Sequence, residues 1–312
     1  MRVQALLIPF IILVTAIAVC GPVEMFAGVE TGESRTPGMN VLRSPIRLAL
    51  IPGNDVLVSD YQSGLILILK GKNLRIVNGF AVAGNPLGVE YAKGVIYVGN
   101  ETTHRVEAYN RAGKRLRRYG FSVPVEKPTD MAADIEANSL FVVDGIGKTV
   151  KVFSLKGDFL RAFPAMNPDS PVLANPTGIA LDSVRREVFV SDYGDPFKTI
   201  DPRVQIFDYS GHVLGTITGK GTGMLGKPRF SRPQGLAVDE SARVFLVDCY
   251  SGEVLVFDRF TGALLKTIGS FGTGPGELQL PLDIVINPSS KDLYLTNNRA
   301  ARIEVFVKGG QL

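Results

Sequence analysis

The sequence predicts an all-β fold built from six repeats, and two observations carry this prediction. First, a proline opens an apolar strand six times, at Pro45, Pro86, Pro128, Pro176, Pro233 and Pro281. A spacing of about 41–57 residues is typical of stacked supersecondary units. Second, each repeat continues with short β-branched and aromatic segments between turn residues, which indicates four antiparallel strands. Six such units predict a six-bladed β-propeller made of four-stranded antiparallel blades.

The best preserved repeats align strand by strand. The first strand reads Pro-Thr-Asp-Met-Ala-Ala-Asp from Pro128 and Pro-Thr-Gly-Ile-Ala-Leu-Asp from Pro176. The second strand ends in an Asp or Asn in every repeat: Asp60, Asn100, Asp144, Asp192, Asp248 and Asn297. A third strand and a hairpin to a fourth strand follow. Each sheet is too small to bury both of its faces, so neighbouring blades must cover them.

The phase of the last repeat predicts how the ring closes. This repeat stops after its third strand, near Val307, with only five residues left. Its fourth strand must therefore come from the segment before the first blade, which we place around Met39 to Arg43. Such pairing removes two open sheet edges. The propeller is expected over residues 41–308, after a linker at residues 28–40 that includes the start of the closing strand.

Residues 1–27 are predicted to be a signal peptide or an N-terminal membrane anchor. Arg2 precedes an uncharged stretch from Val3 to Val23, the pattern of an export signal. Cleavage after Ala27, lipidation of Cys20 and retention as a membrane anchor all remain open. Each alternative places the domain outside the cytoplasm, as a periplasmic, secreted or outward-facing anchored protein.

Composition excludes two classes of protein. The net charge of +4 is scattered along the chain, and no continuous basic face with stacking aromatics is apparent, so nucleic acid is not an expected partner. With only Cys20 and Cys249, the chain has no disulfide framework.

Departures from the repeat indicate where a ligand would bind. The third residue of the first strand is usually glycine, as in Gly88, Gly178 and Gly235, but it is Asp130 in repeat three and Asp283 in repeat six. These two blades lie opposite each other in a six-fold ring, so both carboxylates should face the mouth of the central channel. Such a pair could bind a hard cation such as Ca²⁺, or a cationic ligand.

The Asp or Asn that ends each second strand has two interpretations. The first is a ring of metal ligands. The second, which the once-per-blade spacing favours, is a cap that accepts backbone N–H groups of the turn between the second and third strands, which we call the b-to-c turn. Arg105, Arg203 and Arg302 open third strands and are expected to pair with these side chains.

An insertion in repeat four is the best candidate for a binding loop. Residues 193–202 lengthen its b-to-c loop, on the face that carries the channel mouth, and the long connections at residues 164–175 and 219–232 should lie there too. We predict that a partner contacts Tyr193, Asp195, Phe197, Lys198 and Phe230, with the aromatic rings as anchors. The alternative is a loop that packs over its own blade.

Two glycine-rich phrases give the chain a family resemblance. One runs from Gly269 to Leu278 ahead of Pro281, and the other runs from Gly219 to Gly226 ahead of Phe230 and Pro233. Over about residues 40 to 308 the chain resembles NHL-repeat proteins, which are six-bladed propellers, in their bacterial, exported form. The resemblance implies binding, scaffolding or one of several chemistries.

Repeat three also resembles a propeller lyase of peptide amidation, whose zinc is held by histidines. Here only His104 and His212 are present, on loops of opposite faces, so they cannot share a metal. We therefore expect no catalytic residues, metal ligands or cofactor. The predicted function is a binding or scaffold module for a protein or peptide partner in the cell envelope. The alternative is a divalent-cation-dependent, lactonase-like hydrolase or lyase with its site at the central channel.

Overall fold

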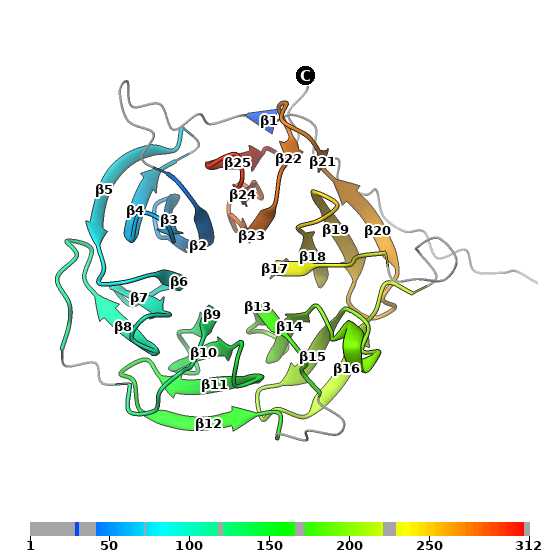
Figure 1. Cartoon of the computed structure of the whole chain (residues 1–312), viewed down its shortest axis with the longest axis horizontal. Helices are drawn as coiled ribbons and strands as arrows, with labels where there is room; N and C mark the ends of the chain where they lie inside the picture. The colour runs from blue at the N-terminus through cyan, green and yellow to red at the C-terminus, as the bar shows by residue number, and fades with distance from the viewer. Residues whose placement is uncertain are drawn as a thin grey trace, which may run out of the picture.

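Six sheets radiate from a central axis and form a closed ring (Figure 1). The computed structural model describes residues 29–30, 42–71, 73–117, 121–165, 172–220 and 229–308. The predicted all-β six-bladed propeller is confirmed. The predicted signal or anchor segment at residues 1–27, and the linker at residues 28–40 apart from Val29 and Glu30, lie outside the described residues.

In blades one to five the strands follow the sequence from the axis outward, whereas the outer strand of blade six comes from the N-terminal part of the chain. Blade one contains β2 (Pro45–Ile51), β3 (Asp55–Asp60), β4 (Leu65–Lys70) and β5 (Arg75–Ala81). Blade two contains β6 (Pro86–Ala92), β7 (Val95–Asn100) and β8 (Arg105–Tyr109). Blade three contains β9 (Pro128–Asp134), β10 (Ser139–Asp144), β11 (Thr149–Ser154) and β12 (Phe159–Phe163).

The second half of the ring repeats this order. Blade four contains β13 (Pro176–Asp182), β14 (Glu187–Asp192), β15 (Arg203–Asp208) and β16 (Val213–Ile217). Blade five contains β17 (Pro233–Val238), β18 (Arg243–Asp248), β19 (Glu253–Asp258) and β20 (Leu264–Ile268). Blade six contains β23 (Pro281–Ile286), β24 (Leu293–Asn297), β25 (Arg302–Phe306) and β1 (Val29–Glu30). A short parallel pair, β21 (Ser270–Phe271) and β22 (Glu277–Leu278), precedes blade six.

The ring is closed by an N-terminal strand, as predicted, but at a different place. Val29 pairs with Phe306 and Glu30 pairs with Val305, both antiparallel, so β1 is the outer strand of blade six. The expected position was around residues 39–43. Of that segment the structure describes Leu42 and Arg43, which are not in a strand; the side chain of Leu42 is instead buried between blades six and one.

Blade two is the exception to the four-stranded pattern. Within the described residues it has three strands, and its outer position is marked only by an isolated bridge between Tyr109 and Arg115. Residues 118–120, further along the same segment, lie outside the described residues.

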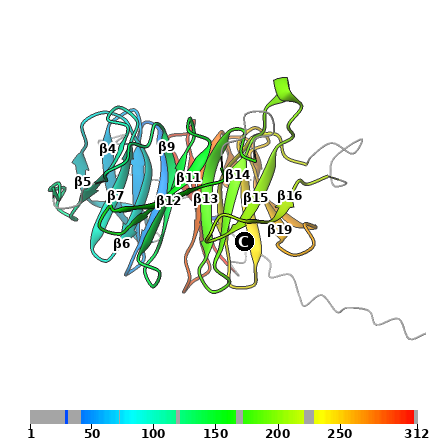
Figure 2. The ribbon, with the colours of Figure 1, turned by 90° about the horizontal axis from the view of Figure 1, so that it is seen from below.

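The hydrophobic core is divided into six clusters, one between each pair of neighbouring blades. This division follows from the sequence, because a blade with apolar residues on both faces must share each face with a neighbour. Glycine at the third position lets the innermost strands approach: a Cβ on Gly178 would lie 2.5 Å from the carbonyl oxygen of Gln234. The ring positions two sets of loops, one on each of its faces (Figure 2). With the strands of a blade lettered a to d from the axis outward, the b-to-c face carries the turns between the second and third strands. The a-to-b face carries the turns between the first and second strands.

Candidate functional site

The central channel is closed near the b-to-c face by the side chain of Arg47. This residue lies on β2 at the third position of its strand and is only 3% exposed. Its Nε donates to the carbonyl oxygen of Thr129 at 2.9 Å, its Nη1 to that of Leu282 at 3.0 Å, and its Nη2 to that of Thr177. One guanidinium from blade one therefore ties together the innermost strands of blades three, four and six.

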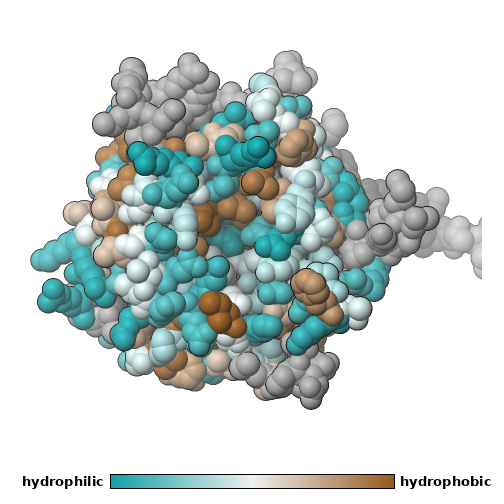
Figure 3. All heavy atoms as spheres, viewed as in Figure 1, coloured by the Kyte–Doolittle hydropathy of each residue, from teal (hydrophilic) through white to brown (hydrophobic). Residues whose placement is uncertain are grey.

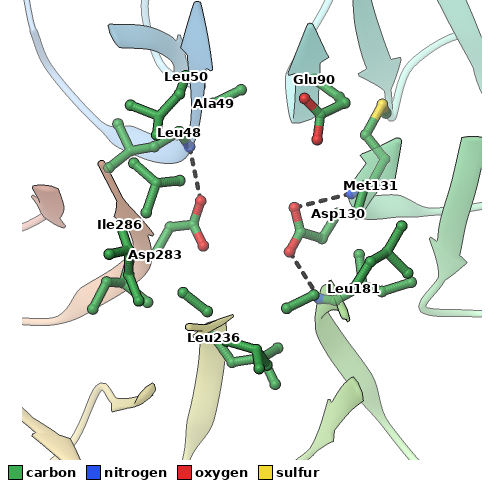
Figure 4. Close-up of a pocket in the computed structure, with 17 residues that line it drawn as sticks. Leu48, Ala49, Leu50, Glu90, Asp130, Met131, Leu181, Leu236, Asp283 and Ile286 are labelled. Carbon is green, nitrogen blue, oxygen red and sulfur yellow. Dashed lines mark hydrogen bonds between the residues drawn. The ribbon is translucent and has the colours of Figure 1, made fainter. Parts of the chain in front are cut away.

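Asp130 and Asp283 face the same channel, as the sequence predicted (Figure 4). The cationic group beside them belongs to the chain itself: Arg47 Nη1 lies 3.3 Å from Asp283 Oδ1, and Arg47 Nε lies 3.7 Å from Asp130 Oδ1. Asp283 Oδ2 also accepts the N–H of Leu48 at 2.8 Å, and Asp130 Oδ2 accepts the N–H of Ile179 at 2.9 Å. Each carboxylate therefore links its own blade to the next one.

Burial determines the titration of these two carboxyl groups. It raises the pKa of Asp130 and of Asp283 above the usual range, and the charge of Asp130 raises the pKa of Asp283 further. The positive charge of Arg47 acts in the opposite direction on both carboxyl groups. Among the residues that the structure describes, no group of three or more His, Cys, Asp or Glu side chains is arranged to hold a metal ion. The geometry thus favours a structural role for both carboxylates over the predicted cation site.

The acidic residues that end the second strands also have a structural role. Asp192 is fully buried; its carboxylate accepts the N–H groups of Ala174 and Asn175, each at 2.8 Å, and that of Gly194 at 2.9 Å. The cap therefore holds the linker that enters the blade as well as the b-to-c turn. Arg203 lies 3.2 Å from the same carboxylate, as expected, and in blade three Lys151 takes this place beside Asp144.

The other two predicted arginines differ from Arg203. Arg302 pairs with Glu304 on its own strand, because blade six ends its second strand in the neutral Asn297. Arg105 pairs in register with Asn100 across β7 and β8, and its side chain is exposed.

The blade-four insertion projects from the b-to-c face (Figure 2), which is the face that Figure 3 shows in space-filling form. It contains a single 3₁₀ turn, η1 (Pro196–Lys198), which begins because Asp195 Oδ1 accepts the N–H of Phe197 at 3.0 Å and Pro196 presets the backbone. Phe197 is 98% exposed at this turn, and Lys198 is also exposed. Asp195 thus orients the loop.

Arg232 connects this loop to blade five. Its guanidinium carbon lies 3.6 Å from the centre of the Tyr193 ring and 5.9 Å from that of Tyr250, which is largely exposed. Tyr250 and Gly252 lie in the b-to-c turn of blade five, between β18 and β19. Phe271 is exposed beside this turn, since a Cβ on Gly252 would lie 2.9 Å from the Cα of Phe271. We call Tyr193, Phe197, Arg232, Tyr250 and Phe271 the aromatic surface. Three of these residues were not among the predicted ones: Arg232, Tyr250 and Phe271.

Phe230 does not belong to the aromatic surface, so its predicted role as an anchor is corrected. It is 1% exposed, and its ring packs edge-on against Phe257, 5.7 Å between centres, in the core between blades four and five. The glycine-rich sequence around it resembles an exposed loop, but the ring itself fills the space under the linker.

Comparisons with known proteins agree with the fold. A family model described as a 6-bladed beta-propeller matches residues 234–306. The human protein NHL repeat-containing protein 3 is 23% identical over 230 residues, which cover 70% of this chain and 63% of that protein. The match therefore spans less than two thirds of this relative. These findings, with the six blades, confirm the predicted six-bladed propeller and its resemblance to NHL-repeat proteins.

Two solved structures share the architecture. The hydrazine synthase of Kuenenia stuttgartiensis superposes with a TM-score of 0.61 over 88% of this chain and 80% of that chain, and the WD40 beta propeller domain of Doa1 with 0.59 over 85% and 79%. Each is 12% identical, so the likeness shows the fold alone. The described residues contain no helix long and apolar enough to cross a membrane.

Proposed function

We propose that this chain, a six-bladed β-propeller of the NHL-repeat type, is an exported binding or scaffold module that holds a protein or peptide partner on its b-to-c face. The observation that carries this proposal is the aromatic surface. Aromatic and arginine side chains are the ones that most often dominate the binding energy of protein interfaces. Here they stand on loops fixed by a rigid ring, the usual arrangement of binding residues.

The insertion is suited to binding because it is already ordered. Asp195 caps the turn that presents Phe197, and the stacking of Arg232 on Tyr193 fixes the base of the loop. A loop that is ordered before binding loses less conformational entropy when a partner docks. The location outside the cytoplasm rests on the sequence before residue 28 and is part of the proposal.

The aromatic surface is expected to contact the partner directly. A photo-crosslinking amino acid at position 197 of the full-length protein should capture the partner in intact cells, whereas one at Val184 should not. Val184 is a matched control because it is 90% exposed but lies in the turn between β13 and β14, on the a-to-b face. Crosslinks from both positions, or from Val184 alone, would contradict the proposal.

With the captured partner purified, replacing Tyr193 and Phe197 together by alanine is expected to weaken binding by about 2–4 kcal/mol, because both anchors are lost. Isothermal titration calorimetry measures this change. Replacing Val184 and Phe260 by alanine, on the opposite face, should leave the affinity unchanged. An unchanged Kd in the Tyr193/Phe197 variant would show that the partner binds elsewhere.

The predicted alternative, a divalent-cation-dependent hydrolase or lyase, has no comparable support. It would use Asp130 and Asp283 as ligands, and both already bond to Arg47 or to backbone N–H groups. We therefore do not advance it.

A further inference from the structure

The innermost strands depart from the repeat at one more position, which no part of the proposed function uses. The fifth residue of these strands is small or β-branched in five blades: Ala49, Ala132, Ala180, Ala237 and Val285. In blade two it is Glu90, and Figure 4 shows its carboxyl group pointing into the channel. A carboxyl group among alanines is costly unless a partner compensates for its charge.

Glu90 lines a cavity of about 260 Å³ in the channel. Most of the lining residues are aliphatic, with Leu48, Leu50, Ile179, Leu181, Leu236 and Ile284 among them, and the walls present polar and apolar surface in about equal parts. The lining begins one residue beyond Arg47 on β2 and continues to Leu50, so the cavity extends from the guanidinium toward the a-to-b face. Its volume is just under the ~300–1,000 Å³ of most ligand sites, which suits a small molecule.

The charges around this cavity do not balance. Its lining contains three titratable groups, namely Glu90, Asp130 and Asp283, and one adjoining cation, Arg47. Arg47 serves the two aspartates. Within the described residues Glu90 has no ion-pair partner. Its Oε1 accepts the neighbouring N–H of Tyr91 at 2.6 Å, and the backbone N–H of Ala133 is a further, neutral donor.

The lack of a paired cation affects the protonation of the Glu90 carboxyl group. Burial raises the pKa of Glu90 to about 8, and the nearby charges of Asp130 and Asp283 act in the same direction. Near neutral pH the surroundings of Glu90 thus favour a proton on its carboxyl group. A bound cation would replace that proton and would lower the pKa.

We propose that the channel binds a small organic cation, a primary ammonium with an apolar chain, whose charged end pairs with Glu90 and whose chain lies along the aliphatic walls. A bare metal ion fits less well, because the described residues offer no cluster of three ligand groups. An ammonium needs one carboxylate, and the cavity supplies apolar surface for the rest of the molecule. The site is independent of the b-to-c face and of its partner.

The test is calorimetric titration of the whole purified protein with n-hexylammonium chloride, and separately with 1-hexanol and with calcium chloride. We expect one hexylammonium ion per chain and at least tenfold weaker binding of the alcohol. Binding should tighten as the pH rises from 6 to 9, because Glu90 must lose its proton while an alkylammonium stays charged. The same titration in buffers of different ionisation enthalpy should show a proton released on binding.

Two variants separate a specific site from a nonspecific one. Glu90→Gln should weaken hexylammonium binding at least tenfold at pH 8.5 and remove the pH dependence. It should fold normally, because the amide replaces a carboxyl group that is favoured in its neutral form. Glu136→Gln, a matched control in the exposed turn after β9, should bind like the unaltered protein. Equal affinity for the alcohol, unchanged binding in Glu90→Gln, or calcium binding that Glu90→Gln abolishes would overturn the proposal.

Discussion

Replacing Arg47 by methionine is expected to lower the free energy of unfolding by at least about 3–5 kcal/mol, the loss typical when one partner of a buried ion pair is removed. The variant leaves Asp130 and Asp283 buried without a cation and removes the donors to the carbonyl groups of Thr129, Thr177 and Leu282. Because a domain is stable by only about 5–15 kcal/mol, this loss should be evident as a much lower melting temperature by circular dichroism.

Arg111→Met is the matched control for this prediction. Arg111 also pairs with a carboxylate, at 2.9 Å from Asp55, but its side chain is largely exposed. An exposed pair contributes about 0–1 kcal/mol, so the control should melt close to the unaltered protein. If both variants lost the same small amount of stability, Arg47 would not be the central tie of the ring.

The pH dependence of the Arg47 variant gives an independent check. Asp130 and Asp283 have pKa values raised in the folded state, and removing the guanidinium raises them further. A carboxyl group with a raised folded pKa binds its proton more tightly when folded, so its contribution to stability is present at low pH and is lost as the pH rises through the folded value. The stability difference between Arg47→Met and the unaltered protein should therefore grow from pH 5 to pH 8.

The sequence predicts the ring and the meeting of two of its carboxylates, because both follow from repeat position alone. Asp130 and Asp283 hold the same position in opposite blades, and this is enough to place them in one channel. Arg47 and Glu90 are visible as departures from the same alignment, at its third and fifth positions. What the alignment does not give is the direction of a long side chain, and so it did not identify Arg47 as the cation beside these aspartates.

Phe230 illustrates an error that repeat register would have prevented. The residue three positions before the opening proline is buried in five blades: Leu42, Val125, Leu173, Phe230 and Leu278. It packs under the linker that enters the blade, whatever the polarity of the linker around it. Exposure was inferred for Phe230 from its glycine-rich surroundings, whereas its repeat position assigns it to the core.

The closing strand could not be placed from sequence because very little specifies it. β1 is two residues long and pairs with β25 through the backbone. Such a short strand has no apolar alternation that sets it apart from the rest of a linker. The missing fourth strand of blade six predicted that a donor exists, and only the path of the chain shows that it is Val29–Glu30.

The second large effect is expected from Asp144, the cap of blade three. It is fully buried; its Oδ1 accepts the N–H groups of Lys127 at 3.0 Å and Gly147 at 2.9 Å, its Oδ2 accepts that of Glu126 at 3.0 Å, and Oδ2 lies 2.8 Å from Lys151 Nζ. Asp144→Ala should cost about 3–5 kcal/mol in urea unfolding, because it leaves the lysine and three N–H groups without their acceptor. Asp201→Ala is the control, since its exposed pair with Lys220 has the same 2.8 Å separation.

Asp144→Asn tests what the charge itself contributes. Blades two and six carry Asn100 and Asn297 at this position, and Asn297 Oδ1 still accepts a linker N–H at 2.8 Å, so the backbone cap survives an amide. The cost should be about 1.5–3 kcal/mol, the value of a hydrogen bond to a charged group, and clearly below the cost of the alanine variant.

The pH dependence of this cost follows from the pKa of Asp144. Burial would raise this pKa, but Lys151 and the N–H donors outweigh the effect of burial and lower it. A lowered folded pKa contributes stability above the unfolded value and loses it as the pH falls through the folded one. The difference between the unaltered protein and Asp144→Asn should therefore be full at neutral pH and shrink below about pH 4, near the unfolded pKa of an aspartate. Equal losses for Asn and Ala would mean that the charge beside Lys151, rather than the linker N–H groups, is what the carboxylate contributes. A difference that did not shrink toward acid would contradict the role of the charge.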